Sequence, residues 1–121
     1  MRALHLIDSI TAITAAMDGG VIVSGSHGGR SVVGFTLACR PHAVFFNDAG
    51  IGKERAGIAA LDQLQAAGMI AAAYSSASAR IGEAEDGLLC GVLSAVNDAG
   101  RAAGLEPGQT VAAAVGLLRR K

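Results

Sequence analysis

Short apolar runs alternate along this chain with clusters of small polar residues. The apolar runs at 3–7, 21–24, 43–47 and 70–75 are continuous enough to be strands buried on both faces of a sheet. Apolar residues recur every three or four positions at 30–39, 55–67 and 83–104, which predicts three helices. The segment 10–17 is predicted as a short helix or as a bent continuation of the first strand, and 110–118 as a last strand.

This alternation of strands and helices predicts an α/β fold. We expect a three-layer α/β/α sandwich with a mostly parallel, Rossmann-like sheet of about four or five strands. The 121 residues are enough for one domain, 1–121, and 51% of them are apolar. In the helix at 83–104, the buried stripe would contain Leu89, Val92 and Val96. Cys39 and Cys90 fall in helical patterns and are expected to be reduced core residues.

Charge and composition narrow the range of partners. The chain carries 10 basic and 10 acidic residues, so it lacks the excess of positive charge that nucleic acids require. It has no apolar run of the ~20 residues that a membrane span needs. Its histidines and cysteines lack metal-ligand spacing, so neither a metal nor a cofactor is expected. Asp8 interrupts the N-terminal apolar run, which disfavours a secretory signal and favours a cytoplasmic location.

Three of the polar clusters stand where strands are predicted to end, at 24–30, 47–53 and 75–80. The carboxyl ends of parallel strands meet along one edge of a sheet, and such sheets bind ligands there. We therefore expect a site at this edge. Asp8 would join it if the first strand is parallel to the others, and would lie at the opposite end if that strand is antiparallel.

The cluster at 24–30 has the strongest functional signal. His27 is a candidate acid or base, since histidine titrates near neutral pH, and Ser26 is a candidate nucleophile if a base lies within reach. Ser24, Gly28 and Gly29 are candidate substrate-binding residues, because a glycine-rich strand-to-helix turn can present N–H groups to an anion. The alternative is a tight turn with Ser26 as a helix cap.

The stretch from His27 to Gly29 resembles the oxyanion-hole loop of α/β-hydrolases. The chain has no G-x-S-x-G nucleophile elbow, however, so an esterase of that type is not expected.

The second cluster contains Asn47, Asp48 and Lys53. Asp48 can orient His27 or act as a base, Asn47 can donate to an oxyanion, and Lys53 can bind an anion. The segment is not a phosphate-binding Walker A loop, because Asn47 stands where the first glycine is required and Glu54 follows Lys53. The alternative is a helix-entry loop that Asp48 caps.

The third cluster contributes Ser76, Ser78 and Arg80. Its hydroxyl groups can bind a polar ligand, and Arg80 can hold a carboxylate or phosphate with two hydrogen bonds. The alternative is a polar crossover in which Arg80 pairs with Glu83 or Glu85.

Together these residues predict a small cytoplasmic, metal-independent enzyme that acts on a small polar or anionic metabolite. Hydrolysis and elimination or isomerisation are the reactions that the set supports, with His27, Asp48 and Ser26 as catalytic residues. The alternative is a non-catalytic subunit that binds a nucleotide or another anion, or docks on a partner. The chain is short and its helices are rich in alanine and glycine, so we also expect a homo-oligomer.

Overall fold

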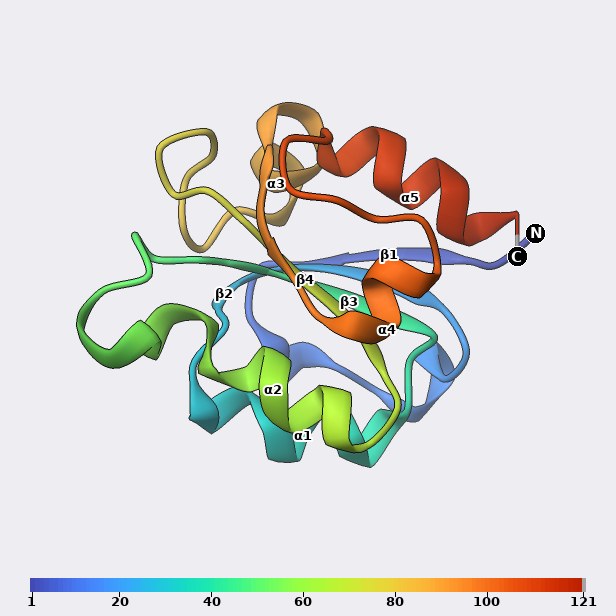
Figure 1. Cartoon of the computed structure of the whole chain (residues 1–121). Coiled ribbons are helices and arrows are strands. Elements are labelled where there is room, and N and C mark those ends of the chain that lie inside the picture. Colours follow the sequence, from blue (N-terminus) through green and yellow to red (C-terminus); the bar gives the residue numbers. More distant parts are fainter. Residues whose placement is uncertain (121) are drawn as a thin grey trace.

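A single five-stranded sheet forms the centre of the molecule. The computed structural model describes residues 1–120, and Lys121, the last residue of the predicted domain, lies outside them. The strands are arranged side by side in chain order, with β1 to β4 parallel and β5 antiparallel to β4 (Figure 1). They are β1 (Leu4–Ile7), β2 (Val21–His27), β3 (Ala43–Asn47), β4 (Ile70–Tyr74) and β5 (Leu93–Val96). The predicted α/β fold with a mostly parallel sheet is confirmed.

Residues 1–120 also form five α-helices and four 3₁₀ turns, of which α4 and α5 follow the last strand. The helices are α1 (Val33–Cys39), α2 (Ala59–Ala66), α3 (Ala84–Cys90), α4 (Asp98–Ala102) and α5 (Val111–Arg119). The 3₁₀ turns are η1 (Ile10–Ala12), η2 (Ala15–Met17), η3 (Arg30–Val32) and η4 (Lys53–Ile58). The segment predicted as a short helix or a bent strand is therefore a pair of 3₁₀ turns, η1 and η2. None of the helices within residues 1–120 is both long and apolar enough to cross a membrane.

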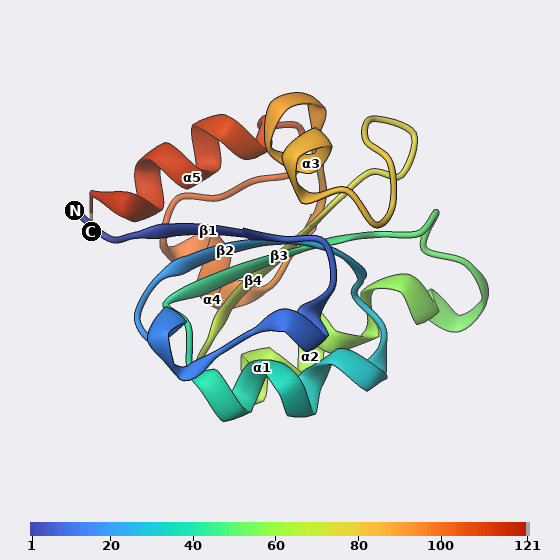
Figure 2. The ribbon, with the colours of Figure 1, turned by 180° about the vertical axis from the view of Figure 1, so that it is seen from behind.

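The two faces of the sheet carry separate apolar clusters, because successive side chains of a strand point to opposite faces. Val23, Phe45 and Tyr74 belong to one cluster, together with residues of α5. Val44 and Phe46 belong to the other cluster, together with residues of α2. Both views of the ribbon show α1 and α2 on one side of the sheet, and α3 and α5 on the other (Figures 1 and 2).

The prediction of one helix at 83–104 is wrong, because the structure divides this segment into α3, β5 and α4. Gly91 ends α3 with an extended backbone and lies so close to α3 and Val111 that a side chain would clash there. The chain then forms β5, in which Leu93 and Val96 are buried. Leu89, expected in a buried stripe, is 70% exposed.

The prediction of a strand at 110–118 is also wrong, because this segment forms α5. The side chain of Thr110 caps the helix by accepting a hydrogen bond from the backbone N–H of Ala113. The buried residues are Val111, Ala114, Val115 and Leu118, a spacing that places them on one helical face.

The two cysteines differ in their surroundings. Cys39 is buried at the end of α1, and its thiol donates a hydrogen bond to the carbonyl oxygen of Thr14. Burial and the nearby Asp18 raise the pKa of the Cys39 thiol. Cys90 is exposed, so its prediction as a core residue is wrong.

Candidate functional site

The predicted polar clusters gather at the carboxyl ends of the parallel strands. Because β1 is parallel to β2, Asp8 lies at this edge as well. Its carboxylate accepts a hydrogen bond from the backbone N–H of Ala84 and so fixes the start of α3. The antiparallel direction of β5 places its first residues beside the end of β4, where Leu93 pairs with Tyr74.

A wide bulge shapes the end of β2. Val23 lies opposite Phe45, but the next paired residue of β2 is His27, opposite Asn47. Three residues of β2 thus lie opposite one residue of β3. In the middle of the bulge, Gly25 lies against the backbone of Asp8 and of the segment that begins α3, where a side chain would clash. Because this close packing holds the backbone of the bulge in place, the side chain of His27 leaves the end of β2 from a fixed position.

The hydroxyl groups of Ser24 and Ser26 help to fix this bulge. Ser24 Oγ accepts a hydrogen bond from the N–H of Ser26, at 2.9 Å. Ser26 Oγ accepts one from the N–H of Ile10, also at 2.9 Å. In the part of the chain that the structure describes, neither hydroxyl is hydrogen-bonded to His27. Ser26, the predicted nucleophile, is therefore adjacent in sequence to His27, its predicted base, but lacks the hydrogen bond that would activate it.

Asn47 and Asp48 are buried, and their side chains bind backbone groups. Asn47 donates to the carbonyl of Ala79 and accepts from the N–H of Ala49. Asp48 is 4% exposed, and its carboxylate accepts three hydrogen bonds. The donors are the N–H groups of Gly50 (2.7 Å) and Ser76 (2.9 Å) and the hydroxyl of Ser94 (2.6 Å). The carboxylate thus connects the ends of β3 and β4 with the start of β5.

The third cluster forms a shallow hollow of about 250 Å³, lined by residues 76–80 and Asp86. Ser78 Oγ donates to the carbonyl of Ser75 and accepts from the N–H of Val92. The side chain of Arg80 is 76% exposed and lies 4.0 Å from a carboxylate oxygen of Glu83, as the alternative interpretation expected. A pair this exposed contributes little to stability.

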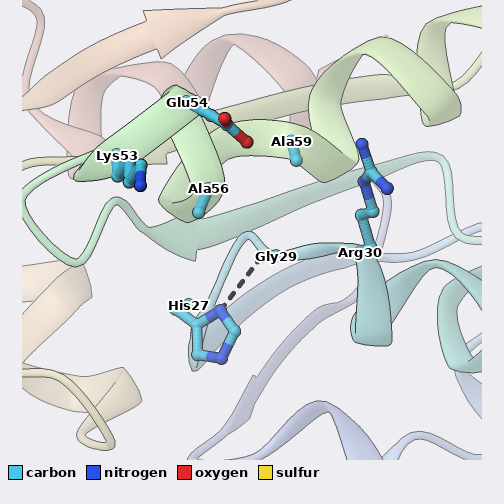
Figure 3. A pocket seen from close by; sticks show the side chains of 7 residues that line it. All are labelled: His27, Gly29, Arg30, Lys53, Glu54, Ala56 and Ala59. Carbon is cyan, nitrogen blue, oxygen red and sulfur yellow. Dashed lines mark hydrogen bonds between the residues drawn. The ribbon is translucent and has the colours of Figure 1, made fainter.

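His27 lies in a different and larger cavity, of about 390 Å³, between the end of β2 and η4 (Figure 3). His27 and Arg30 belong to one side of the cavity, and Lys53 and Glu54 belong to the other. Two permanent cations and one carboxylate therefore line the same cavity as the histidine. The full lining is His27, Gly29, Arg30, Lys53, Glu54, Ala56 and Ala59.

The ring of His27 is oriented by its own loop. Its Nδ1 atom accepts a hydrogen bond from the backbone N–H of Gly29, at 3.1 Å (Figure 3). An Nδ1 atom that accepts a hydrogen bond carries no proton, so the neutral ring has its proton on Nε2. In this geometry the neutral ring of His27 offers an N–H donor at Nε2.

The loop that carries Lys53 has an unusual backbone. Its non-glycine residues Ala49, Ile51, Glu54 and Arg55 all have positive φ, between 51° and 67°. This conformation costs roughly 1–2 kcal/mol per residue, and a β-branched residue such as Ile51 rarely adopts it. Backbone strain of this kind often occurs at functional sites.

Arg30 and Glu54 line the cavity although neither was predicted from the sequence as a site residue. The signal for Arg30 was present, since it follows Gly28 and Gly29 directly and begins the next helical turn. Glu54 gave no signal other than its place beside Lys53. Arg30 and Glu54 also line a neighbouring hollow of about 300 Å³ together with Asp62 and Gln63, which extends the site along α2.

Two further observations concern possible ligands and relatives. Among the residues that the structure describes, no three His, Cys, Asp or Glu side chains gather closely enough to hold a metal ion. The chain matches no protein-family model, no curated protein and no solved structure.

Proposed function

We propose that the protein binds a small molecule with an anionic group in the cavity between β2 and η4. The observation that carries this proposal is that Arg30, Lys53 and His27 line one cavity. Arginine and lysine supply charge-assisted hydrogen bonds to a carboxylate or a phosphate. A neutral histidine adds a directed donor.

Glu54 supports a more specific proposal about the ligand. It contributes an acceptor beside the three donors, on the same side of the cavity as Lys53. A ligand that combines an anionic group with a hydroxyl or amino group would satisfy both sides. We therefore propose hydroxy acids, amino acids and sugar phosphates as the classes to test first.

The binding test compares two arginines at the same edge of the sheet. Thermal shift and calorimetry would be run with a panel of these compounds on the wild type, Arg30→Ala and Arg80→Ala. Saturation at 100 times the dissociation constant stabilises a protein by about 2.7 kcal/mol. Loss of a charge-assisted hydrogen bond, worth roughly 1.5–3 kcal/mol, should weaken binding about 10- to 100-fold in Arg30→Ala. Arg80→Ala should bind as the wild type does.

The opposite pattern, with binding lost in Arg80→Ala and kept in Arg30→Ala, would move the site to the hollow at 76–80. No stabilisation by any compound would count against anion binding as a whole.

Catalysis at the same cavity is the second candidate function, and the strained loop at 49–55 favours it. Under this second proposal, the protein is a metal-independent hydrolase, lyase or isomerase. The Nε2–H of His27 stabilises negative charge that develops on the substrate, as a fixed hydrogen-bond donor. His27→Ala should then abolish turnover of a bound compound while the protein stays folded. Full turnover in this variant would exclude the role of His27.

A further inference from the structure

The two edges of the sheet differ in how they are covered. The segment before α5 lies along the outer edge of β5, where Leu93 donates to the carbonyl of Gln109 and accepts from the N–H of Gly108. An isolated antiparallel bridge between Val92 and Thr110 continues this contact. At the other edge, β1 pairs with β2 only, and no other strand within residues 1–120 lies beside it.

The free edge of β1 presents a short, regular set of backbone groups. In parallel strands the N–H and C=O of one residue point to one neighbour, and those of the next residue point the other way. The carbonyl of Ala3 accepts from the N–H of Val21, so Ala3, His5 and Ile7 face β2. Leu4 and Leu6 therefore direct their N–H and C=O groups outward.

Apart from its short length and the contact of Arg119 with Arg2 at its start, β1 lacks the features that usually protect an edge strand. Natural edges carry lysine, proline, a bulge or a covering segment. β1 reads Leu-His-Leu-Ile, and its pairing with β2 has no register shift. Leu6 is 42% exposed and Met1 is 91% exposed, so apolar side chains accompany the open backbone.

We propose that β1 pairs with β1 of a second copy of this chain, antiparallel and about a two-fold axis at His5. In this register Leu4 lies opposite Leu6 of the second copy, and Leu6 opposite Leu4. All outward N–H and C=O groups of these two residues are then hydrogen-bonded, and the two sheets join into one of ten strands. This proposal is independent of the ligand proposed above.

The charges at the two ends of the strand favour this register. Arg2 and Arg119 lie together at the start of β1, where the backbone N–H of Arg2 donates to the carbonyl of Arg119 and Arg119 Nε donates to the carbonyl of Arg2. Asp8 follows the end of β1. Antiparallel pairing about His5 brings the end that carries Arg2 and Arg119 in each copy near Asp8 of the other, while the outward N–H and C=O groups of Arg2 stay bonded to Arg119. A parallel arrangement would place like charges side by side.

The first test is the mass of the particle in solution. Sedimentation of the wild type at micromolar concentration should show a dimer. Leu6→Lys places two like charges at the contact and should weaken the dimer by about 100-fold or more. Leu37→Lys is the matched control, because Leu37 is similarly exposed (37%) but lies on α1. A monomeric wild type, or a dimer that Leu6→Lys leaves intact, would overturn the proposal.

The second test is the register, measured by cross-linking in a Cys90→Ser background. In an antiparallel pair the two His5 residues lie about 4.5 Å apart between Cα atoms, so His5→Cys should form a disulfide between copies. Ala3→Cys should not, because four residues separate each Ala3 from its symmetry mate along the strand, about 13 Å. Circular dichroism would check that both variants are folded. Cross-linking of Ala3→Cys instead of His5→Cys would overturn the proposed pairing.

Discussion

The hydroxyl of Tyr74 donates a hydrogen bond to the carbonyl oxygen of Ser24, at 2.7 Å. This contact connects β4 to β2 past the strand between them, and both residues are fully buried. Ser24 lies in the bulge of β2, which has lost its regular pairing with β3. The tyrosine thus replaces a backbone partner that the bulge removes, and it supports the strand end from which His27 emerges.

Tyr74→Phe should therefore destabilise the protein. The variant leaves a buried carbonyl without its partner, which costs roughly 1–3 kcal/mol of the free energy of unfolding. Denaturation by urea would measure this loss. A variant as stable as the wild type would show that the bulge does not depend on this bond.

The same residue should make stability fall at alkaline pH. Burial, Asp86 and Asp8 raise the pKa of Tyr74 above its usual value. Above pH ~10 an unfolded tyrosine loses its proton while the folded one keeps it, so stability is full below that pH and is lost as the pH rises, by up to about 1.4 kcal/mol per pH unit. Urea denaturation across this range should show a smaller decline for Tyr74→Phe than for the wild type.

Phenolate absorbance gives an independent check, because the chain contains one tyrosine. The absorbance should appear only as the protein unfolds. If it appears while the protein is still folded, the hydroxyl is not buried as described.

Asp48→Asn should reduce stability without reducing ligand binding. The carboxylate accepts three hydrogen bonds; in the amide the bond with the Ser94 hydroxyl has to reverse its direction, and the bonds from Gly50 and Ser76 lose a charged acceptor. Hydrogen bonds to charged groups contribute roughly 1.5–3 kcal/mol each, so a loss in this range is expected in urea denaturation. Ser94→Ala removes one of the donors and should cost less. Unchanged stability together with lost binding or turnover would instead assign Asp48 to the reaction.

Gly57→Ala should disrupt the loop that carries Lys53. A side chain at Gly57 would overlap the carbonyl oxygen of Asp48. The loop would have to shift, so binding of the ligand should weaken together with stability. Gly34→Ala is the matched control, since nothing lies within 4 Å of that position and alanine favours a helix by about 1 kcal/mol over glycine. Thermal denaturation of both variants would compare them, and an equal effect would contradict the close packing.

The first four strands could be predicted from the sequence because each is a continuous apolar run that ends in small polar residues. β5 could not, since it has only four residues and Leu89, Val92 and Val96 match the period of a helix. Its strand conformation depends on pairing with β4 and on contacts at Gly91, neither of which is visible in a local pattern.

The edge of the sheet where the polar clusters gather was predictable, but the contacts of each polar side chain were not. Small polar residues after a strand bind nearby backbone groups readily, and Asn47, Asp48 and Ser78 do so here. The longer side chains of Arg30, Lys53 and Glu54 reach beyond the backbone into the cavity. Side-chain length and the direction in which each loop leaves the sheet therefore separate these two groups of residues.

The sequential order of the strands has a consequence for folding. Each strand pairs with the strand that precedes it in the chain, so the sheet can grow from β1 one strand at a time. The face covered by α1 and α2 has its helices once β4 has been made. The opposite face needs α5, the last helix. During synthesis from the N-terminus, the part of this face that α5 covers thus stays exposed after α3 has formed, until the final helix is made.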